Sequence, residues 1–169
     1  LGEALYTTYL YPFEIAAAVQ EVESLLRYES RQHGAVIAVQ PAAATVVGDR
    51  TQIQQVLINL LLNAMEAVAD SPVDRRRIDV AISRKRHRVL LTVRDHGSGI
   101  PPEHLPRLFD SFFTTKRQGM GLGLSISRSV VQAHHGRIWA ENAPGGGAVF
   151  HVELPVASGR REPAPARPA

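Results

Sequence analysis

Polar side chains suited to metal chemistry recur along one apolar stretch, residues 52–69. They lie three or four residues apart, so on a helix they share one flank: Gln52, Gln55, Asn59, Asn63 and Glu66. Asparagine favours helices poorly because its amide competes with backbone hydrogen bonds. One explanation is that these amides are simply hydrogen-bonded to a neighbouring helix. The other is Mg²⁺, because an amide oxygen is a hard, neutral ligand and Mg²⁺ combines few protein oxygens with substrate phosphates.

A carboxylate beside two glycines follows an alternating, strand-like run. Asp95 comes first, then Gly97 and Gly99. A carboxylate only accepts hydrogen bonds, so Asp95 could bind the exocyclic amino group of adenine while the glycines let the backbone approach the ring. Asp-x-Gly is also common in turns at strand ends. The residues alone leave both interpretations open.

A third signal is the series Gly119, Gly121 and Gly123, which opens a predicted helix. Glycines there let backbone N–H groups approach phosphate oxygens, and the helix dipole favours the anion. The series does not follow a buried strand directly, as a dinucleotide-binding fold requires. The chain also lacks the Gly-Lys-Ser/Thr triplet of a P-loop. The glycines therefore need support from the rest of the chain.

Helical spacing of apolar residues predicts three helices that position these groups. They cover residues 13–33, the stretch around 52–69, and a segment with Leu122, Ile126, Val130 and Ala133 on one face that ends at Gly136. Asp49 and Gln52 resemble a capping box at the start of the second helix.

Short β-prone or alternating runs predict five strands. They lie at residues 35–40, 78–82, 89–93, 137–141 and 148–154. Between the third strand and the last helix, residues 101–121 form a long irregular segment anchored by Phe109, Phe112 and Phe113. A loop of that length inside a compact domain is typical of a functional lid.

Composition limits the possible classes. A chain of 169 residues predicts one domain, and the absence of cysteine excludes disulfides and thiolate metal sites. No apolar run is long enough to span a bilayer and no signal peptide opens the chain, so we expect a cytoplasmic setting. A net charge of +3 is too small to indicate nucleic acid. The basic run 84–88 has no interleaved aromatic residue and is expected to be a solvated hairpin tip.

Taken together, the motifs form a pattern in one order. Asn-x-x-x-Asn lies on a helix, Asp-x-Gly-x-Gly-Ile follows a strand, Phe-Phe-Thr-Thr-Lys comes next, and Gly-x-Gly-x-Gly-Leu opens a helix. This pattern resembles the catalytic, ATP-binding domain of sensor histidine kinases, which is related to the ATPases of type II topoisomerases, heat-shock chaperones and mismatch repair. The resemblance covers about residues 12–155. It implies an α+β, two-layer sandwich with a mixed, mostly antiparallel sheet, helices on one face and an ATP lid.

The resemblance also implies roles for individual residues. Asn63 matches the Mg²⁺ ligand and Asn59 a position beside the triphosphate, whereas Asp95 matches the residue that binds adenine. Lys116 matches a lid lysine that reaches the terminal phosphates. The remaining residues expected to bind ATP are Gly97, Gly99, Ile100, Thr115, Gly119, Gly121, Leu122, Gly123 and Leu124. His96 departs from the commoner Asn or Thr beside the aspartate, with little expected effect because adenine binding does not need that position.

The implied function is transfer of the ATP γ-phosphate to a histidine on a separate dimerisation domain, followed by relay to a response regulator. In the hydrolytic relatives a glutamate stands four residues before the metal-binding Asn. Here that residue is Asn59, whose amide cannot take a proton, which favours transfer over hydrolysis. The alternatives are a nucleotide-binding or docking module without turnover, and an anti-sigma-type serine kinase.

The acceptor histidine is expected outside this chain, because none of its seven histidines has the expected helical-hairpin setting. We expect residues 1–11 to be the end of a preceding dimerisation hairpin or linker, 12–156 to be the catalytic domain and 157–169 to be a disordered tail. The parent protein is expected to be a homodimer and this chain a monomer. A metal site from His134, His135 and His151 is disfavoured, because ordinary exposure explains these residues.

Overall fold

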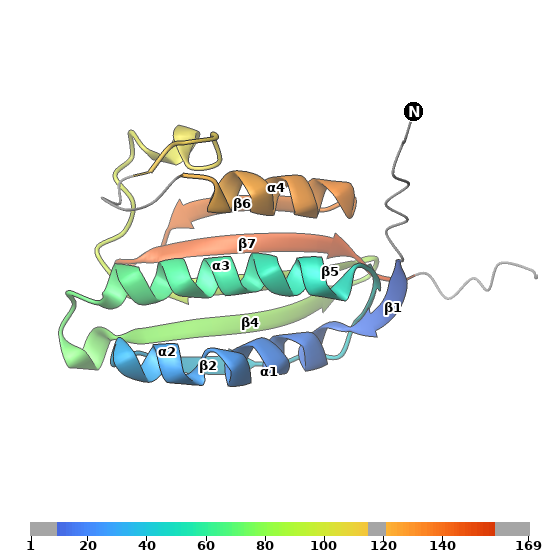
Figure 1. Cartoon of the computed structure of the whole chain (residues 1–169), viewed down its shortest axis with the longest axis horizontal. Coiled ribbons are helices and arrows are strands. Elements are labelled where there is room, and N and C mark those ends of the chain that lie inside the picture. The colour runs from blue at the N-terminus through green and yellow to red at the C-terminus, as the bar shows by residue number, and fades with distance from the viewer. Residues whose placement is uncertain (1–9, 115–120, 158–169) are drawn as a thin grey trace, which may run out of the picture.

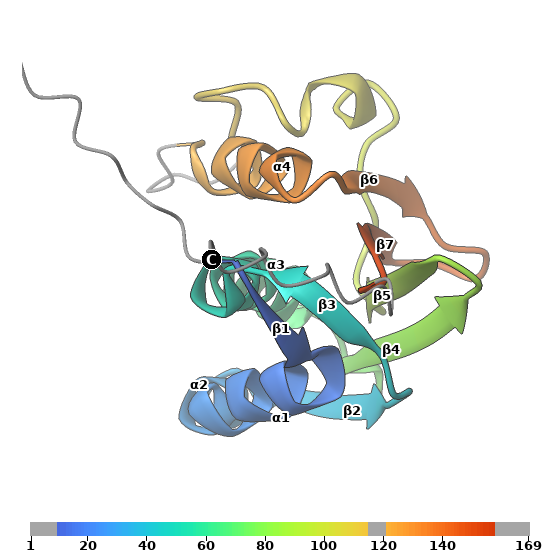
Figure 2. The same cartoon turned by 90° about the vertical axis from the view of Figure 1, so that its right-hand side faces the viewer.

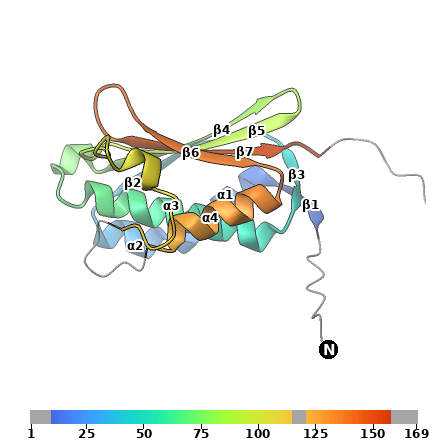
Figure 3. The same cartoon turned by 90° about the horizontal axis from the view of Figure 1, so that it is seen from above.

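The computed structural model describes residues 10–114 and 121–157, which fold as a sheet with helices on one side. Five strands form the main sheet in the order β2-β4-β5-β7-β6. Within the part of the chain that the structure describes, β2 and β4 of this sheet run parallel, and its other neighbouring pairs are antiparallel. Viewed from above, the helices all lie below this sheet (Figure 3). The predicted α+β sandwich with a mixed, mostly antiparallel sheet is confirmed.

The elements follow one another in a mixed order. The strands are β1 (Tyr11–Glu14), β2 (Val36–Gln40), β3 (Thr45–Gly48), β4 (Arg77–Lys85), β5 (Arg88–Asp95), β6 (Arg137–Asn142) and β7 (Ala148–Pro155). The helices are α1 (Ile15–Leu25), α2 (Arg27–Gln32), α3 (Arg50–Val68) and α4 (Gly123–Ala133), with short 3₁₀ turns at Val73–Arg75 and Leu105–Arg107. None of the described helices is long and apolar enough to cross a membrane.

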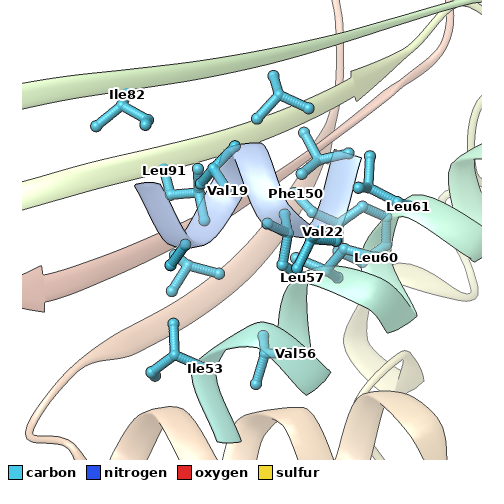
Figure 4. Packing of buried hydrophobic residues seen from close by; sticks show 14 of the residues in the cluster. Val19, Val22, Ile53, Val56, Leu57, Leu60, Leu61, Ile82, Leu91 and Phe150 are labelled. Carbon is cyan, nitrogen blue, oxygen red and sulfur yellow. The ribbon is translucent and has the colours of Figure 1, made fainter. Parts of the chain in front are cut away.

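The core lies between the sheet and the helix layer, with α3 at its centre. Alternate residues of β4, β5 and β7 are buried, as expected when one face of a sheet is covered. Figure 2 shows α1, α3 and α4 side by side against that face. The apolar face of α3 packs beneath the strands (Figure 4) through Ile53, Val56, Leu57, Leu60, Leu61, Ala64, Met65 and Val68.

The start of α3 is capped in a way that the sequence predicted only in part. The Asp49 carboxylate accepts a hydrogen bond from the Gln52 N–H at 3.0 Å, as predicted. In a full capping box the Gln52 side chain would also accept a hydrogen bond from the Asp49 N–H, but this second bond does not form. The Asp49 N–H donates instead to Nε2 of His134, at 3.0 Å. The other ring nitrogen, Nδ1, donates to the Val130 carbonyl at 2.7 Å. One neutral imidazole, 6% exposed, thus joins the end of α4 to the start of α3.

Two helix predictions were wrong in detail. The predicted helix over residues 13–33 begins at Ile15 and is interrupted at Leu26, which separates α1 from α2. The apolar face predicted for α4 is wrong in part as the buried face: Val130 packs partly buried against the core, but Ile126 is 57% exposed and Ala133 is exposed. The helix instead buries Ser127 and Val131. Apolar residues lie on both the buried and the exposed sides of this short helix, as Val131 and Ile126 show, so their spacing did not identify the face that contacts α3.

Candidate functional site

A cavity of about 490 Å³ opens where α3, the end of β5, the segment after β5 and the start of α4 meet. In Figure 1 that segment stands beside the start of α4. Nine of the predicted site residues line the cavity: Asn59, Asn63, Asp95, Gly99, Ile100, Gly121, Leu122, Gly123 and Leu124. They come from four separate parts of the chain. The fold therefore brings the motifs that the sequence singled out into one place.

Asp95 is the most buried polar group at the cavity, at 3% exposed. Its Oδ1 accepts hydrogen bonds from the N–H of Gly97 at 2.9 Å and of Ala148 at 3.3 Å. Burial raises the pKa of this carboxyl, and the two backbone N–H groups offset part of that effect. Within the described structure both hydrogen bonds fall on Oδ1, so Oδ2 remains to accept one from a bound molecule.

The loop after Asp95 is held in place by close backbone contacts. A Cβ on Gly97 would lie 2.4 Å from the Ala67 carbonyl oxygen, so only glycine allows this loop to pack so tightly on α3. Asn142, at the end of β6, bonds both backbone groups of Ile100: its Oδ1 accepts from the N–H at 2.7 Å and its Nδ2 donates to the carbonyl at 2.8 Å. This clamp fixes Ile100 as part of the cavity wall.

The opposite part of the cavity lies between α3 and the start of α4. Asn59 donates from Nδ2 to the Ser127 hydroxyl at 3.2 Å, which ties the two helices together. A Cβ on Gly123 would lie 2.5 Å from the Asn59 amide oxygen. The absence of a side chain at Gly123 thus lets α4 begin directly against the polar flank of α3. Asn63 and Glu66 line the cavity from further along that flank.

Apolar and aromatic groups complete the walls. Phe113 lines the cavity and meets the His104 ring edge to face, with ring centroids 5.4 Å apart. Phe109 packs edge to face against Phe150, at 6.4 Å between centroids. Phe112, the third predicted aromatic anchor, points outward instead and is 72% exposed. Phe113 therefore forms part of the cavity wall, and Phe109 packs behind it against Phe150, another wall residue.

Some predicted residues lie elsewhere and some functional residues were missed. Gly97 shapes the loop without lining the cavity. Thr115, Lys116 and Gly119 lie outside the described residues. The motifs did not predict Asn142 at Ile100, or these further residues of the cavity wall: Leu62, His104, Leu108, Ala148 and Phe150. Leu62 lies within the Asn-x-x-x-Asn motif, but no local motif marks the others, because long-range strand pairing and chain folding bring them to the site.

The described parts of the chain hold no group of three His, Asp or Glu side chains that could bind a metal ion by themselves. His134 is buried and bonded at both nitrogens, contrary to the exposure that the sequence suggested. His151 stacks on Trp139, with ring centroids 4.8 Å apart, and contacts the Glu141 carboxylate at 2.8 Å.

The part of the chain that forms the cavity matches a known protein family. Residues 48–158 match the sequence profile described as histidine kinase-, DNA gyrase B- and HSP90-like ATPase, which covers α3, the cavity and the strands around it. The chain belongs to this ATPase family. The family resemblance inferred from the four motifs is thereby confirmed.

Relatives within this ATPase family include named sensor kinases. The chain is 49% identical over 121 residues to the sensor protein FixL of Bradyrhizobium diazoefficiens, a match to 71% of this chain and 24% of FixL. It is 37% identical over 152 residues to the sensor histidine kinase TmoS of Ectopseudomonas mendocina, covering 87% of this chain and 16% of TmoS. The chain thus spans less than a quarter of the length of these two relatives.

Solved structures of family members superpose closely. The catalytic domain of the histidine kinase ThkA matches with a TM-score of 0.77 and 36% identity, over 86% of this chain and 95% of that domain. ThkA bound to the response regulator protein TrrA matches with a TM-score of 0.73 and 32% identity, over 88% and 42%. Full-length ShkA in complex with AMPPNP matches with a TM-score of 0.77 and 27% identity, over 91% and 32%.

Proposed function

We propose that this ATPase-family chain is the catalytic domain of a two-component sensor histidine kinase, which binds Mg-ATP and passes its γ-phosphate to a histidine on another domain. The observation that carries the proposal is the cavity itself. It joins a buried carboxylate with an open acceptor oxygen, Asp95, to two helix amides, Asn59 and Asn63, and to the first turn of α4. Support comes from the sensor kinases among its relatives.

The nucleotide would bind with its base at Asp95 and its phosphates toward α4. Oδ2 of Asp95 would accept a hydrogen bond from the exocyclic amino group, while Ile100, fixed by Asn142, would pack against the ring. The first N–H groups of α4 have no partner within the helix, and the dipole there favours anions. The triphosphate would therefore lie between the start of α4 and Asn63.

The donor set also fits a magnesium ion. Asn63 lines the cavity and carries an amide oxygen, which is a hard, neutral ligand. Such a ligand suits Mg²⁺, which binds through few protein oxygens together with substrate phosphates. When bound, Mg²⁺ would neutralise charge on the triphosphate, as phosphoryl transfer requires. Lys116 and Gly119 are proposed to contribute from the segment between Thr114 and Gly121.

Transfer rather than hydrolysis is favoured by the chemistry of Asn59. An amide cannot take a proton from water, and this one is already tied to the Ser127 hydroxyl. The acceptor domain would dock beside the cavity. Ile126, 57% exposed on α4, and Phe112, 72% exposed on the preceding segment, are apolar groups available for that contact. We further propose that a response regulator is a partner, that the parent protein is a homodimer, and that this domain lies in the cytoplasm.

We propose that residues 12–156 form the catalytic domain, preceded by the end of a dimerisation hairpin or linker and followed by a tail. The described chain extends slightly beyond these limits. Tyr11 pairs with Gly48 in the β1–β3 sheet, and the Ala157 N–H donates to the Thr45 carbonyl at 2.8 Å.

The test is phosphoryl transfer to a separate acceptor. The chain is mixed with the histidine-bearing dimerisation domain of its own parent protein and with ATP labelled at the γ-phosphate. We expect label on the acceptor that is stable to alkali and lost in acid, and none with Asn63→Ala. ATP binding without any transfer would favour a docking module without turnover. Label on a serine of another protein would favour a serine kinase.

A further inference from the structure

We propose that His104 is a further nucleotide-binding residue, which donates a hydrogen bond from Nε2–H to a ribose or phosphate oxygen of the nucleotide. The inference rests on the proposed function, because it requires a nucleotide in the cavity. None of the sequence motifs marks His104, which lies between the Asp95 loop and the phenylalanines.

The imidazole is held in place by its surroundings. The His104 N–H donates to the Pro101 carbonyl at 2.9 Å, and the His104 carbonyl accepts from the Arg107 N–H at 2.9 Å, so the backbone forms a fixed turn. The ring meets Phe113 edge to face, at 5.4 Å between centroids and 67° between planes. The Arg107 guanidinium lies 4.7 Å from the centre of the same phenyl ring. A side chain packed in this way loses little freedom when a ligand binds.

The two ring nitrogens of His104 differ in their surroundings. Nδ1 is buried and has no hydrogen-bond partner in the described structure. Either tautomer leaves Nδ1 without a partner, but an orphaned buried N–H is rarer in proteins than an under-satisfied acceptor. The uncharged ring therefore carries its proton on Nε2. Nε2 is not sealed off in the same way, and the side chain lines the cavity.

An N–H donor at the cavity wall requires an acceptor in the ligand. Asp95 is an acceptor and would take the amino edge of the base, so the two residues would bind different parts of the nucleotide. The ribose and the phosphates are rich in acceptor oxygens, and His104 has the complementary chemistry for them.

The experiment compares two substitutions in the whole chain. His104→Phe keeps an aromatic ring against Phe113 but removes the N–H. His104→Gln loses the ring but places an amide N–H near the position of Nε2. By calorimetry at pH 7.5, we expect about three- to tenfold weaker ATP binding for His104→Phe, from the loss of one hydrogen bond. We expect binding within about twofold of the natural chain for His104→Gln. His87→Phe, on the exposed β4–β5 turn, is the matched control and should change nothing.

Nucleotide analogues identify the oxygen. If the penalty of His104→Phe disappears with 2′-deoxy- or 3′-deoxy-ATP, the acceptor is a ribose hydroxyl. If it is present with ATP and absent with adenosine, the acceptor is a phosphate oxygen.

Three results would overturn the inference. They are natural affinity in His104→Phe, equal losses in both variants, and a penalty of the same size with every analogue. Thermal melts identify any variant that fails to fold. Failure of the natural chain to bind ATP would instead count against the proposed function.

Discussion

Replacing Asp95 with asparagine should separate nucleotide binding from folding. Asparagine is nearly the same size, and its amide oxygen can still accept the hydrogen bonds from Gly97 and Ala148. Its NH₂ group then takes the place of Oδ2 and faces the cavity as a donor. Two donors would meet where the adenine amino group binds, so ATP affinity should fall while the empty domain stays folded.

The expected size follows from the lost contact. A hydrogen bond to a charged group contributes about 1.5–3 kcal/mol, and each 1.4 kcal/mol is a factor of ten, so ATP should bind about 10- to 150-fold more weakly. Guanine carries a carbonyl oxygen where adenine has its amino group. The new donor at position 95 should therefore reduce the preference for ATP over GTP.

The stability of the empty domain should not fall. Burial raises the folded-state pKa of Asp95 above its usual value of 3.8. A raised pKa means that the stabilising contribution is complete below the unfolded-state value and is lost as pH rises through the folded-state value. At neutral pH the buried charge is thus a cost, and Asp95→Asn removes it. The melting temperature at pH 7 should equal or exceed that of the natural chain.

The assay is calorimetric titration with ATP and GTP, together with thermal melts of the empty protein. Asp79→Asn is the matched control, because Asp79 pairs with His96 and Arg77 outside the cavity. As pH falls through the pKa of Asp95, the natural chain should lose ATP affinity more steeply than Asp95→Asn. Unchanged affinity and unchanged preference for ATP in Asp95→Asn would refute the assigned role.

Three further predictions concern the parts that position the site. Gly97→Ala should lower stability by about 1–3 kcal/mol and weaken ATP binding, because its Cβ would meet the Ala67 carbonyl oxygen. Denaturation and binding measurements test this. Gly145→Ala is the control for backbone strain, because Gly145 has a positive φ but no atom within 4 Å of an added Cβ. His134→Ala should cost about 2–3 kcal/mol in urea denaturation, since it removes the hydrogen bond from the Asp49 N–H at the start of α3 and the ring's second hydrogen bond, to the Val130 carbonyl within α4. A smaller loss than for exposed His135→Ala would contradict this. Ile126→Asp should leave ATP affinity unchanged but reduce transfer at least tenfold, and normal transfer would exclude α4 as the docking surface.

How far the sequence predicts the structure depends on the range of the interactions. Alternation of apolar and polar residues predicted β4, β5 and β7, because one face of each strand is buried. The length and cap of α3 could also be predicted, because they depend on residues that are close together in the sequence. The buried face of α4 was not readable, since tertiary contacts place the polar Ser127 in the interior and leave Ile126 outside. Among the described residues, the short strands β1 and β3 pair with each other alone, and their apolar pattern was too brief to detect.

The candidate site divides in the same way. Asn63, Asp95 and the glycines are marked by motifs in the sequence, because each needs a fixed residue type at a fixed spacing. The groups that hold them come from distant segments. Ala148 reaches Asp95 across a separation of 53 residues, and Asn142 reaches Ile100 across 42. Such partners are set by sheet pairing, which no local pattern reports.

A crystal structure of the chain with Mg²⁺ and a nonhydrolysable ATP analogue tests the central claim most directly. The account predicts the exocyclic amino group of adenine within hydrogen-bond distance of the Asp95 carboxylate, and the triphosphate between Asn63 and the first turn of α4. An analogue bound elsewhere, or one whose base lies against α4 with its phosphates at Asp95, would contradict it.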